Sequence, residues 1–420
     1  MKKSLASLIL LTAVSFTLQS QKKELVRLTV EAGKYERINT PVSFDLSGIN
    51  KPDTLSFHLY ESVKGKITPV PSQVEEGYSP RLWWIMSGTT PAGSKRYYVL
   101  YQEAGEKQKP AVSAIVTPDI IRLEQEGKPV LDYAVKLVYP PAKVDTAYKR
   151  NGFIHPLYSP SGNILTRINA PDHYHHFGIW NPWTVVRIRN HVTDFWNLYS
   201  RQGTVRFAGL NYIIEGSVFG GFNVRHEHVD FRGKKPEEIT FNEVWDVRVW
   251  NTSALSGSKA WLVDFTSNLS VAADTTIILE AYRYGGGIGF RATAQWNNKN
   301  SWVLTSEGKT RADADGTRAR WTDVGGAFEG SGESGIVFFS HPSNREHPEP
   351  MRVWPVDMNG RGDVYFEFCP IRHKSWILEP GNIYRLKYRM LVYDGRVDKE
   401  TAERIWTDFA FPPAVKAETR

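Results

Sequence analysis

Short runs in which apolar and polar residues alternate follow one another along most of the chain. Clear examples are residues 25–30, 54–60, 96–101 and 240–250, and turn-forming residues separate the runs. A period of two is typical of strands that bury one face. A convincing helical period occurs only at residues 399–408. The pattern therefore predicts an all-β protein with one helix near its end.

The spacing of these runs divides the chain into two β-rich units. The polar segment 102–110 ends in proline and is the best linker between them. We predict a small N-terminal β-sandwich over residues 22–115 and a large antiparallel sandwich or barrel-like unit over residues 116–397. Residues 398–420 would form a C-terminal helix and tail. Within the large unit, residues 204–211 and 212–218 are predicted to be separate strands.

The first 21 residues have the features of a secretory signal peptide. Lys2 and Lys3 precede an apolar stretch that is too short to span a bilayer. We expect residues 1–21 to be cleaved and the mature protein to be periplasmic or secreted, with no membrane insertion. The alternative is a retained N-terminal anchor. Cys369 is the only cysteine, so no intrachain disulfide can form, which suits a bacterial periplasm.

Charge and composition narrow the class of partner. The formal net charge is +7, but basic and acidic residues are interleaved, and no run of five basic residues occurs. This pattern argues against nucleic-acid binding and is compatible with weak attraction to acidic polysaccharide. The chain has 14 Trp, 19 Tyr and 20 Phe, and some of these rings, such as Trp180, are candidates for stacking on sugars. The sequence does not indicate an oligomeric state.

The densest group of chemically versatile side chains is Asp172-His173-Tyr174-His175-His176. On an extended segment His173 and His175 would face one side and His176 the other. Neutral imidazoles bind Zn, Cu, Fe or Ni, so His173 and His175 are candidate ligands of a divalent metal. The same side chains could act as acid, base or sugar contact near neutral pH. They could also do no more than satisfy backbone groups of a loop.

Other segments contribute further candidates, each with a plainer alternative as a surface, core or ion-paired residue. His155 lies upstream of the histidine cluster, and Glu243 interrupts the apolar side of the strand predicted at residues 240–250. A proline-rich loop and a glycine-rich segment supply most of the remainder. The proline-rich loop contributes His341, Asn344 and His347, and the glycine-rich segment at residues 282–291 contributes Tyr282, Tyr284 and Arg291. Arg361 and Arg372 come from a third segment, residues 359–373.

Several of these segments resemble a bacterial family of unknown function that carries the label PmoA, after a methane oxygenase. The matching residues are 152–162, 165–167, 172–180 and 341–344, followed by weaker matches over 380–395. The resemblance covers about residues 118–395. It implies a fold similar to galactose-mutarotase-like and polysaccharide-lyase domains. The expected fold class is therefore all-β, with a small N-terminal β-sandwich followed by a large antiparallel β-supersandwich.

We predict an exported carbohydrate-active protein, with a glycan-degrading hydrolase or lyase favoured. The alternatives are a non-catalytic glycan-binding protein and the metal-dependent oxidoreductase or oxygenase that the label implies. The candidate catalytic residues are His155, His173, His175, His176, Glu243 and His341. The candidate substrate-binding residues are Arg167, Asp172, Trp180, Tyr282, Arg291, Asn344, His347, Arg361 and Arg372. The partner would be an oligo- or polysaccharide, with a divalent metal at the histidine cluster as an open question.

Overall fold

A computed structural model describes residues 22–49, 56–103, 109–233, 235–251 and 260–418. The predicted signal peptide lies outside these residues, and so does most of the predicted linker. Within the described residues strands dominate, and α1 (Lys399–Ala410) is the one α-helix. This confirms the predicted all-β fold and the helix near the end of the chain. No helix in the described part is long and apolar enough to cross a membrane.

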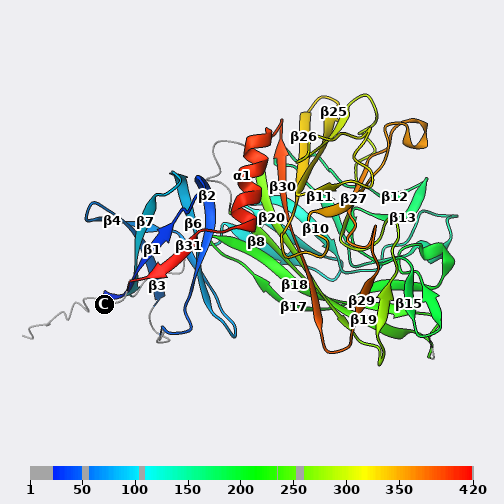
Figure 1. The fold of residues 1–420 in the computed structure, drawn as a ribbon, viewed down its shortest axis with the longest axis horizontal. Helices are drawn as coiled ribbons and strands as arrows, with labels where there is room; N and C mark the ends of the chain where they lie inside the picture. The colour runs from blue at the N-terminus through cyan, green and yellow to red at the C-terminus, as the bar shows by residue number, and fades with distance from the viewer. Residues whose placement is uncertain (1–21, 50–55, 104–108, 234, 252–259, 419–420) are drawn as a thin grey trace, which may run out of the picture.

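Two sheets form a small sandwich, seen at the left of Figure 1. The first sheet has the order β31 (Ala414–Ala417), β1 (Lys23–Glu31), β7 (Lys95–Glu103), β3 (Ser56–Val63), β4 (Lys66–Val70). The second has the order β2 (Arg37–Asp45), β6 (Arg81–Thr90), β5 (Ser72–Glu75). Leu28 and Tyr98 from the first sheet pack with Leu82 and Trp84 from the second in one buried core. The alternation of apolar residues thus places one face of each sheet inside.

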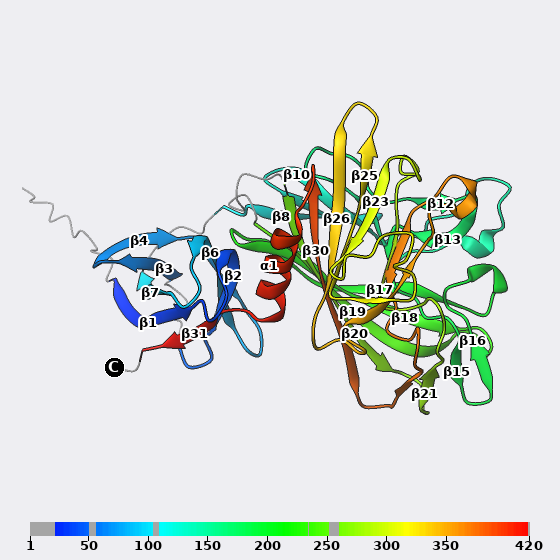
Figure 2. The ribbon, with the colours of Figure 1, turned by 45° about the horizontal axis from the view of Figure 1, so that its top comes forward.

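The final strand closes this small sandwich. β31 pairs antiparallel with β1, from Leu28 opposite Ala417 to Glu31 opposite Ala414. The polypeptide therefore returns to its first sheet after completing the large unit. Figures 1 and 2 both place α1 at the junction between the two units, with β31 lying among the N-terminal strands.

The large unit is a sandwich of two extensive sheets. The nine-stranded sheet has the order β24 (Arg318–Ala319), β27 (Glu349–Val353), β28 (Tyr365–Phe368), β22 (Ile288–Arg291), β14 (Ile179–Trp180), β11 (Ile154–Leu157), β10 (Lys128–Ala134), β9 (Ile120–Gln125), β8 (Val112–Val116). The eight-stranded sheet has the order β17 (Gly203–Ile214), β18 (Phe219–Asp230), β19 (Glu238–Trp250), β20 (Ala260–Val271), β30 (Ile383–Asp394), β26 (Gly332–Ser340), β25 (Trp321–Phe328), β23 (Ser301–Thr305). One buried core joins side chains from both sheets, as a β-supersandwich requires.

β19 shows how the sequence pattern produces this packing. Phe241, Trp245, Val247 and Val249 are buried on its inner face, as the alternation predicts. The prediction of two separate strands over residues 204–211 and 212–218 is wrong, because β17 runs as one strand across the predicted break. Register shifts between Phe207 and Gly209 and between Leu210 and Tyr212 bend β17 and interrupt its alternation.

Smaller elements complete the large unit at the end farthest from the small sandwich (Figure 1). They are a two-stranded sheet of β12 (Ile168–Ala170) and β13 (His173–Phe177), and a four-stranded sheet in the order β16 (His191–Thr193), β15 (Val186–Ile188), β21 (Ile277–Leu279), β29 (Trp376–Leu378). Three short 3-10 helices accompany the strands: η1 (Thr146–Tyr148), η2 (Leu198–Ser200) and η3 (Met358–Gly360).

Candidate functional site

The three histidines of the densest cluster lie on β13, at an irregular pairing with β12. Ile168 pairs with Phe177 and Ala170 with His173, so three residues of β13 stand opposite one residue of β12. Such a bulge turns side chains away from strict alternation. The expectation that His176 faces away from His173 is therefore wrong. Their ring centroids are 4.8 Å apart, closer than the 5.3 Å between His173 and His175.

The three imidazoles converge on one point at the wall of a pocket. One ligand atom from each of the three rings lies within 4.8 Å of the others. The pocket has a volume of about 230 Å³. Its other lining side chains are aromatic, amide, guanidinium and thioether groups: Trp196, Asn197, Arg283, Tyr284, Arg352, Trp354, Met358 and Tyr365. None of the lining residues in the described part of the chain is an aspartate or a glutamate.

Burial keeps two of these histidines uncharged. It lowers the pKa of His175 to about 3, and the nearby His173 and Arg291 add to the effect. Burial also holds the pKa of His176 well below its usual value, helped by His175 and Arg291. Neutral imidazoles keep a free lone pair for a proton or a metal. Nδ1 of His176 is buried and has no hydrogen-bond partner among the residues that the structure describes.

Asp172 orients the third histidine. Nδ1 of His173 donates a hydrogen bond of 2.8 Å to Oδ2 of Asp172, so Nε2 is the nitrogen of His173 that remains free. Nη2 of Arg291 lies 2.8 Å from the same carboxylate oxygen, and Asn359 donates to it at 3.0 Å. Burial opposes ionisation of Asp172, but the hydrogen bond with His173 and the charge of Arg291 outweigh burial and lower its pKa.

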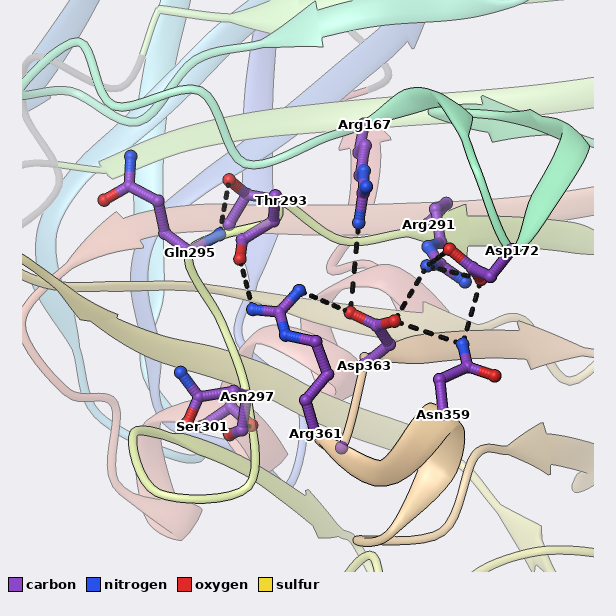
Figure 3. A network of polar contacts seen from close by, with 12 residues as sticks. Arg167, Asp172, Arg291, Thr293, Gln295, Asn297, Ser301, Asn359, Arg361 and Asp363 are labelled. Atoms are coloured by element: carbon purple, nitrogen blue, oxygen red, sulfur yellow. Dashed lines mark hydrogen bonds and ion pairs between the residues drawn. The ribbon is translucent and has the colours of Figure 1, made fainter.

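A second carboxylate, Asp363, extends the polar network of Asp172 and Arg291 (Figure 3). Asp363 lies 2.7 Å from Arg361, 3.5 Å from Arg291 and 3.9 Å from Arg167. The structure thus brings together four of the residues predicted to bind substrate, because Asp172 joins the same network through Arg291. These arginines pair with carboxylates of the protein itself, and only 1% of the Arg291 side chain is exposed to a substrate.

Glu243 and His155 lie outside the pocket lining. Glu243 is buried in the core, where Asn181, Ser267, Trp245 and His228 all donate to its carboxylate at 2.5 to 2.9 Å. Burial would raise its pKa, but the hydrogen bond and charge of His228 reverse the shift and bring the pKa to about 2. Nδ1 of His155 is 2.9 Å from Oγ1 of Thr166, and burial lowers the pKa of His155 to about 4.

The proline-rich loop packs against the C-terminal helix rather than the pocket. His341 contacts the ring of Phe409 at 5.0 Å, and His347 stacks on Trp406 at 6.1 Å. Asn344 donates a hydrogen bond of 2.8 Å to the buried carboxyl of Glu349. The predicted site residues of this loop are therefore separated from the histidine cluster.

The remaining predicted residues surround the pocket without lining it. Trp180 is fully buried, and its ring supports His176 at a centroid distance of 4.9 Å. Tyr282 contacts Tyr284 edge to face at 5.0 Å. Arg372 pairs with Asp315 at 3.0 Å, and the same carboxylate holds Arg352 at 2.6 Å. Cys369 is buried and, as the only cysteine of the sequence, free.

Sequence reasoning missed seven residues of the lining: Trp196, Asn197, Arg283, Arg352, Trp354, Met358 and Tyr365. Arg283 lies inside the glycine-rich segment that the sequence analysis singled out, and this was the only feature of the sequence that could have indicated it. The others come from segments far apart in the chain: β27 and the residue that follows it, η3, β28 and the residues before η2. Only the pairing of β28 with β22 and β27 brings two of these segments together.

Comparison with known proteins places the chain in a family. The model of a family of unknown function, DUF6807, matches residues 121–407, which include the whole histidine cluster and its carboxylate network. The chain belongs to this family. The description of the family names no activity, so the methane-oxygenase label remains a prediction. No curated protein matches this chain.

A search of solved structures finds an alpha-mannosidase from Enterococcus faecalis. The present chain is 10% identical to that mannosidase in sequence, and the two structures align with a TM-score of 0.43. The alignment covers 96% of this chain and 46% of that chain, so this chain spans less than half the length of the mannosidase.

Proposed function

We propose that this protein is an exported carbohydrate-active enzyme, a lyase that cleaves a glycosidic bond beside a uronic acid in the pocket of His173, His175 and His176. The observation that carries the proposal is the composition of the pocket. Its lining offers imidazole, guanidinium and phenol groups, and no carboxylate among the described residues. A typical glycoside hydrolase needs two carboxyl groups beside the scissile bond. Elimination needs instead a cation near the substrate carboxylate and a group that exchanges a proton.

The reaction would be a β-elimination on the uronic acid. The C5–H bond breaks, its proton passes to a basic group of the pocket, and its electron pair forms a C4=C5 double bond. The C4–O bond breaks at the same time, and the departing oxygen takes a proton. The histidines and Tyr284 are the pocket groups that can exchange that proton. Every atom of the substrate remains in the two products.

Arg283 is the side chain best placed to recognise the acid. It is exposed at the pocket and makes no ion pair within the described residues, whereas Arg352 pairs with Asp315. A free guanidinium binds a carboxylate in a bidentate manner. Trp354, Trp196 and Tyr365 form the buried aromatic wall of the pocket, with 4%, 1% and 2% of their surface exposed.

The pocket size limits how much substrate enters. Its volume of about 230 Å³ is below the range of about 300–1,000 Å³ that is typical for drug-sized ligands. We therefore propose that one sugar ring occupies the pocket, either at the end of a glycan or within a short oligosaccharide.

The test is incubation with a panel of uronic-acid oligosaccharides, followed by ultraviolet absorbance of the new double bond and mass spectrometry. We expect unsaturated products from the wild type and a loss of about 100-fold in kcat/KM for Arg283→Ala, because a preorganised charge partner is removed. Arg187→Ala is the matched control, since Arg187 is a half-exposed arginine outside the pocket, paired with Glu280 at 2.6 Å. Saturated products would show hydrolysis instead, and binding without turnover would show a glycan-binding protein.

A further inference from the structure

We propose that His173, His175 and His176 together bind one divalent transition metal of the zinc class, with an open coordination position toward the pocket. The metal site itself is independent of the lyase reaction. Only its catalytic role rests on the proposed function. The first support is distance, since one nitrogen of each ring lies within 4.8 Å of the others. Tetrahedral zinc with Zn–N bonds of about 2.0–2.1 Å places its nitrogens about 3.4 Å apart. Small side-chain rotations on the bulged strand β13 would close the difference.

The second support is the orientation and pairing of the rings. The hydrogen bond from Nδ1 of His173 to Asp172 leaves Nε2 with its lone pair available. This carboxylate–histidine arrangement is the usual outer partner of a metal-bound histidine. His176 is 3% exposed, and its Nδ1 has no partner in the described residues. A buried polar atom without a partner is destabilising, and it is rare unless something binds it.

The charges around the cluster allow a cation to enter. Arg291 would repel a metal, but Asp172 lies 2.8 Å from its guanidinium and Asp363 lies 3.5 Å from it. Both carboxylates are part of the network in Figure 3, which also holds Arg361 and Arg167. Asp172 is thus a positioning residue, which fixes His173 and offsets the positive charge of Arg291.

The donor set selects the class of metal. Ca²⁺ and Mg²⁺ prefer oxygen ligands, and the three convergent groups are all imidazoles. Three imidazoles suit zinc and its neighbours in the transition series. Three protein ligands also leave the fourth position of a tetrahedral metal open, as in catalytic rather than structural zinc sites.

A bound metal would change which lining residues bind the substrate carboxylate and which exchange protons. With all three imidazoles on the metal, the open position and Arg283 would together neutralise the substrate carboxylate. Proton exchange would then fall to Tyr284, whose hydroxyl contacts Asn197 at the long distances of 3.3 and 3.4 Å. The other tyrosine of the lining is less available, because the hydroxyl of Tyr365 donates to Glu367 at 2.5 Å.

The experiment is a titration of chelator-treated full-length protein with Zn²⁺ by calorimetry and with Co²⁺ by visible spectroscopy. We expect one metal per chain and the visible bands of tetrahedral cobalt. His175→Ala should abolish stoichiometric binding, and His175→Gln provides a second variant if the alanine variant does not fold. Asp172→Asn should weaken binding by about 10- to 100-fold while keeping the stoichiometry. His373→Ala is the control, because His373 is exposed, lies outside the cluster and hydrogen-bonds to the carbonyl of Gly316.

Two results would overturn the site: no stoichiometric binding by folded wild-type protein, or equal binding by the folded His175 variant. The lyase proposal is tested separately, because these titrations need no substrate. Metal binding without elimination would leave the site standing and remove the lyase function. Undiminished elimination by chelated protein would show that the metal has no catalytic role.

Discussion

Glu349 is a carboxyl group in the core of the large sandwich, close to the proline-rich loop. It is fully buried and accepts hydrogen bonds from Ser340, from Asn344 at 2.8 Å and from Tyr388 at 2.7 Å. Burial raises its pKa to about 7, although these three hydrogen bonds act in the opposite direction. Its proton is therefore bound more tightly in the folded than in the unfolded chain.

Glu349→Gln should flatten the pH dependence of stability. Because the folded pKa of Glu349 is raised, its contribution is complete below the unfolded pKa of 4.5 and is lost as the pH rises to about 7. Relative to the glutamine variant, the wild type should lose about 3 kcal/mol of unfolding free energy over that interval. Glutamine has nearly the same shape, and the Tyr388 hydroxyl can accept its amide hydrogen.

The measurement is urea denaturation of both proteins at several pH values between 4 and 8. If the unfolding free energies of the two proteins changed in parallel with pH, the raised pKa of Glu349 would be contradicted. The other buried carboxyls, such as Glu367, contribute equally to both proteins and cancel in the comparison.

At the scale of elements, the bulge of β13 depends on the glycine that ends it. Gly178 has a φ of +62°, and a Cβ there would lie 2.3 Å from the carbonyl oxygen of Ile154. Its amide donates to the carbonyl of Arg167 at 2.9 Å. Gly178 is therefore fixed between the segments that contain Ile154 and Arg167, and it keeps the histidines of β13 in their convergent positions.

Gly178→Ala should cost roughly 3 kcal/mol or more of unfolding free energy, since it combines left-handed strain with a backbone collision. It should also weaken zinc binding, because the collision displaces β13. Gly127→Ala is the matched control, with a φ of +76° and no atom within 4 Å of the added Cβ. The control should show only the strain of about 1–2 kcal/mol and normal zinc binding. Chemical denaturation and the zinc titration measure both effects, and equal losses in the two variants would refute the role of Gly178.

The same segment shows where sequence reasoning reached its limit. Alternation predicted the strands, and the density of His and Asp marked β13 as chemically unusual. Alternation also predicted that His176 faces away, because a bulge that depends on long-range pairing leaves no mark in a local period. Arg352 and Tyr365 were missed for a related reason. They reach the pocket through pairing of strands far from β13 in sequence, and single residues on those strands look like any others.

At the scale of the whole molecule, the two sandwiches are joined by buried polar contacts as well as by apolar ones. Nη1 of Arg37 lies 2.8 Å from Asp408 of α1, and the exposed fractions of their side chains are 3% and 5%. Thr40 donates to the same carboxylate at 2.8 Å. On the other side of the junction, Trp83 of the small unit packs on Trp250 of β19 at 5.2 Å. These contacts couple the stabilities of the two units.

Asp408→Ala should lower the unfolding free energy by about 3–5 kcal/mol, because it leaves the buried Arg37 without its charge partner. We expect calorimetry to resolve two transitions where the wild type has one, as the small unit loses its contact with α1. Glu307→Ala, which removes an ion pair in which Glu307 has 47% of its side chain exposed, should change stability by less than about 0.5 kcal/mol. A single transition with an unchanged midpoint in Asp408→Ala would refute the coupling.

The pairing of β31 with β1 has a further consequence for how the chain acquires its structure in time. Domains commonly fold in the order in which they leave the ribosome. Here the edge strand of the first sheet is synthesised only after the whole large sandwich, so the first unit to begin is the last to be completed. Until then the outer edge of β1 stays unpaired and open to other strands. The large sandwich must consequently fold next to an unfinished neighbour, and the sheet of β1 is closed only when β31 has been synthesised.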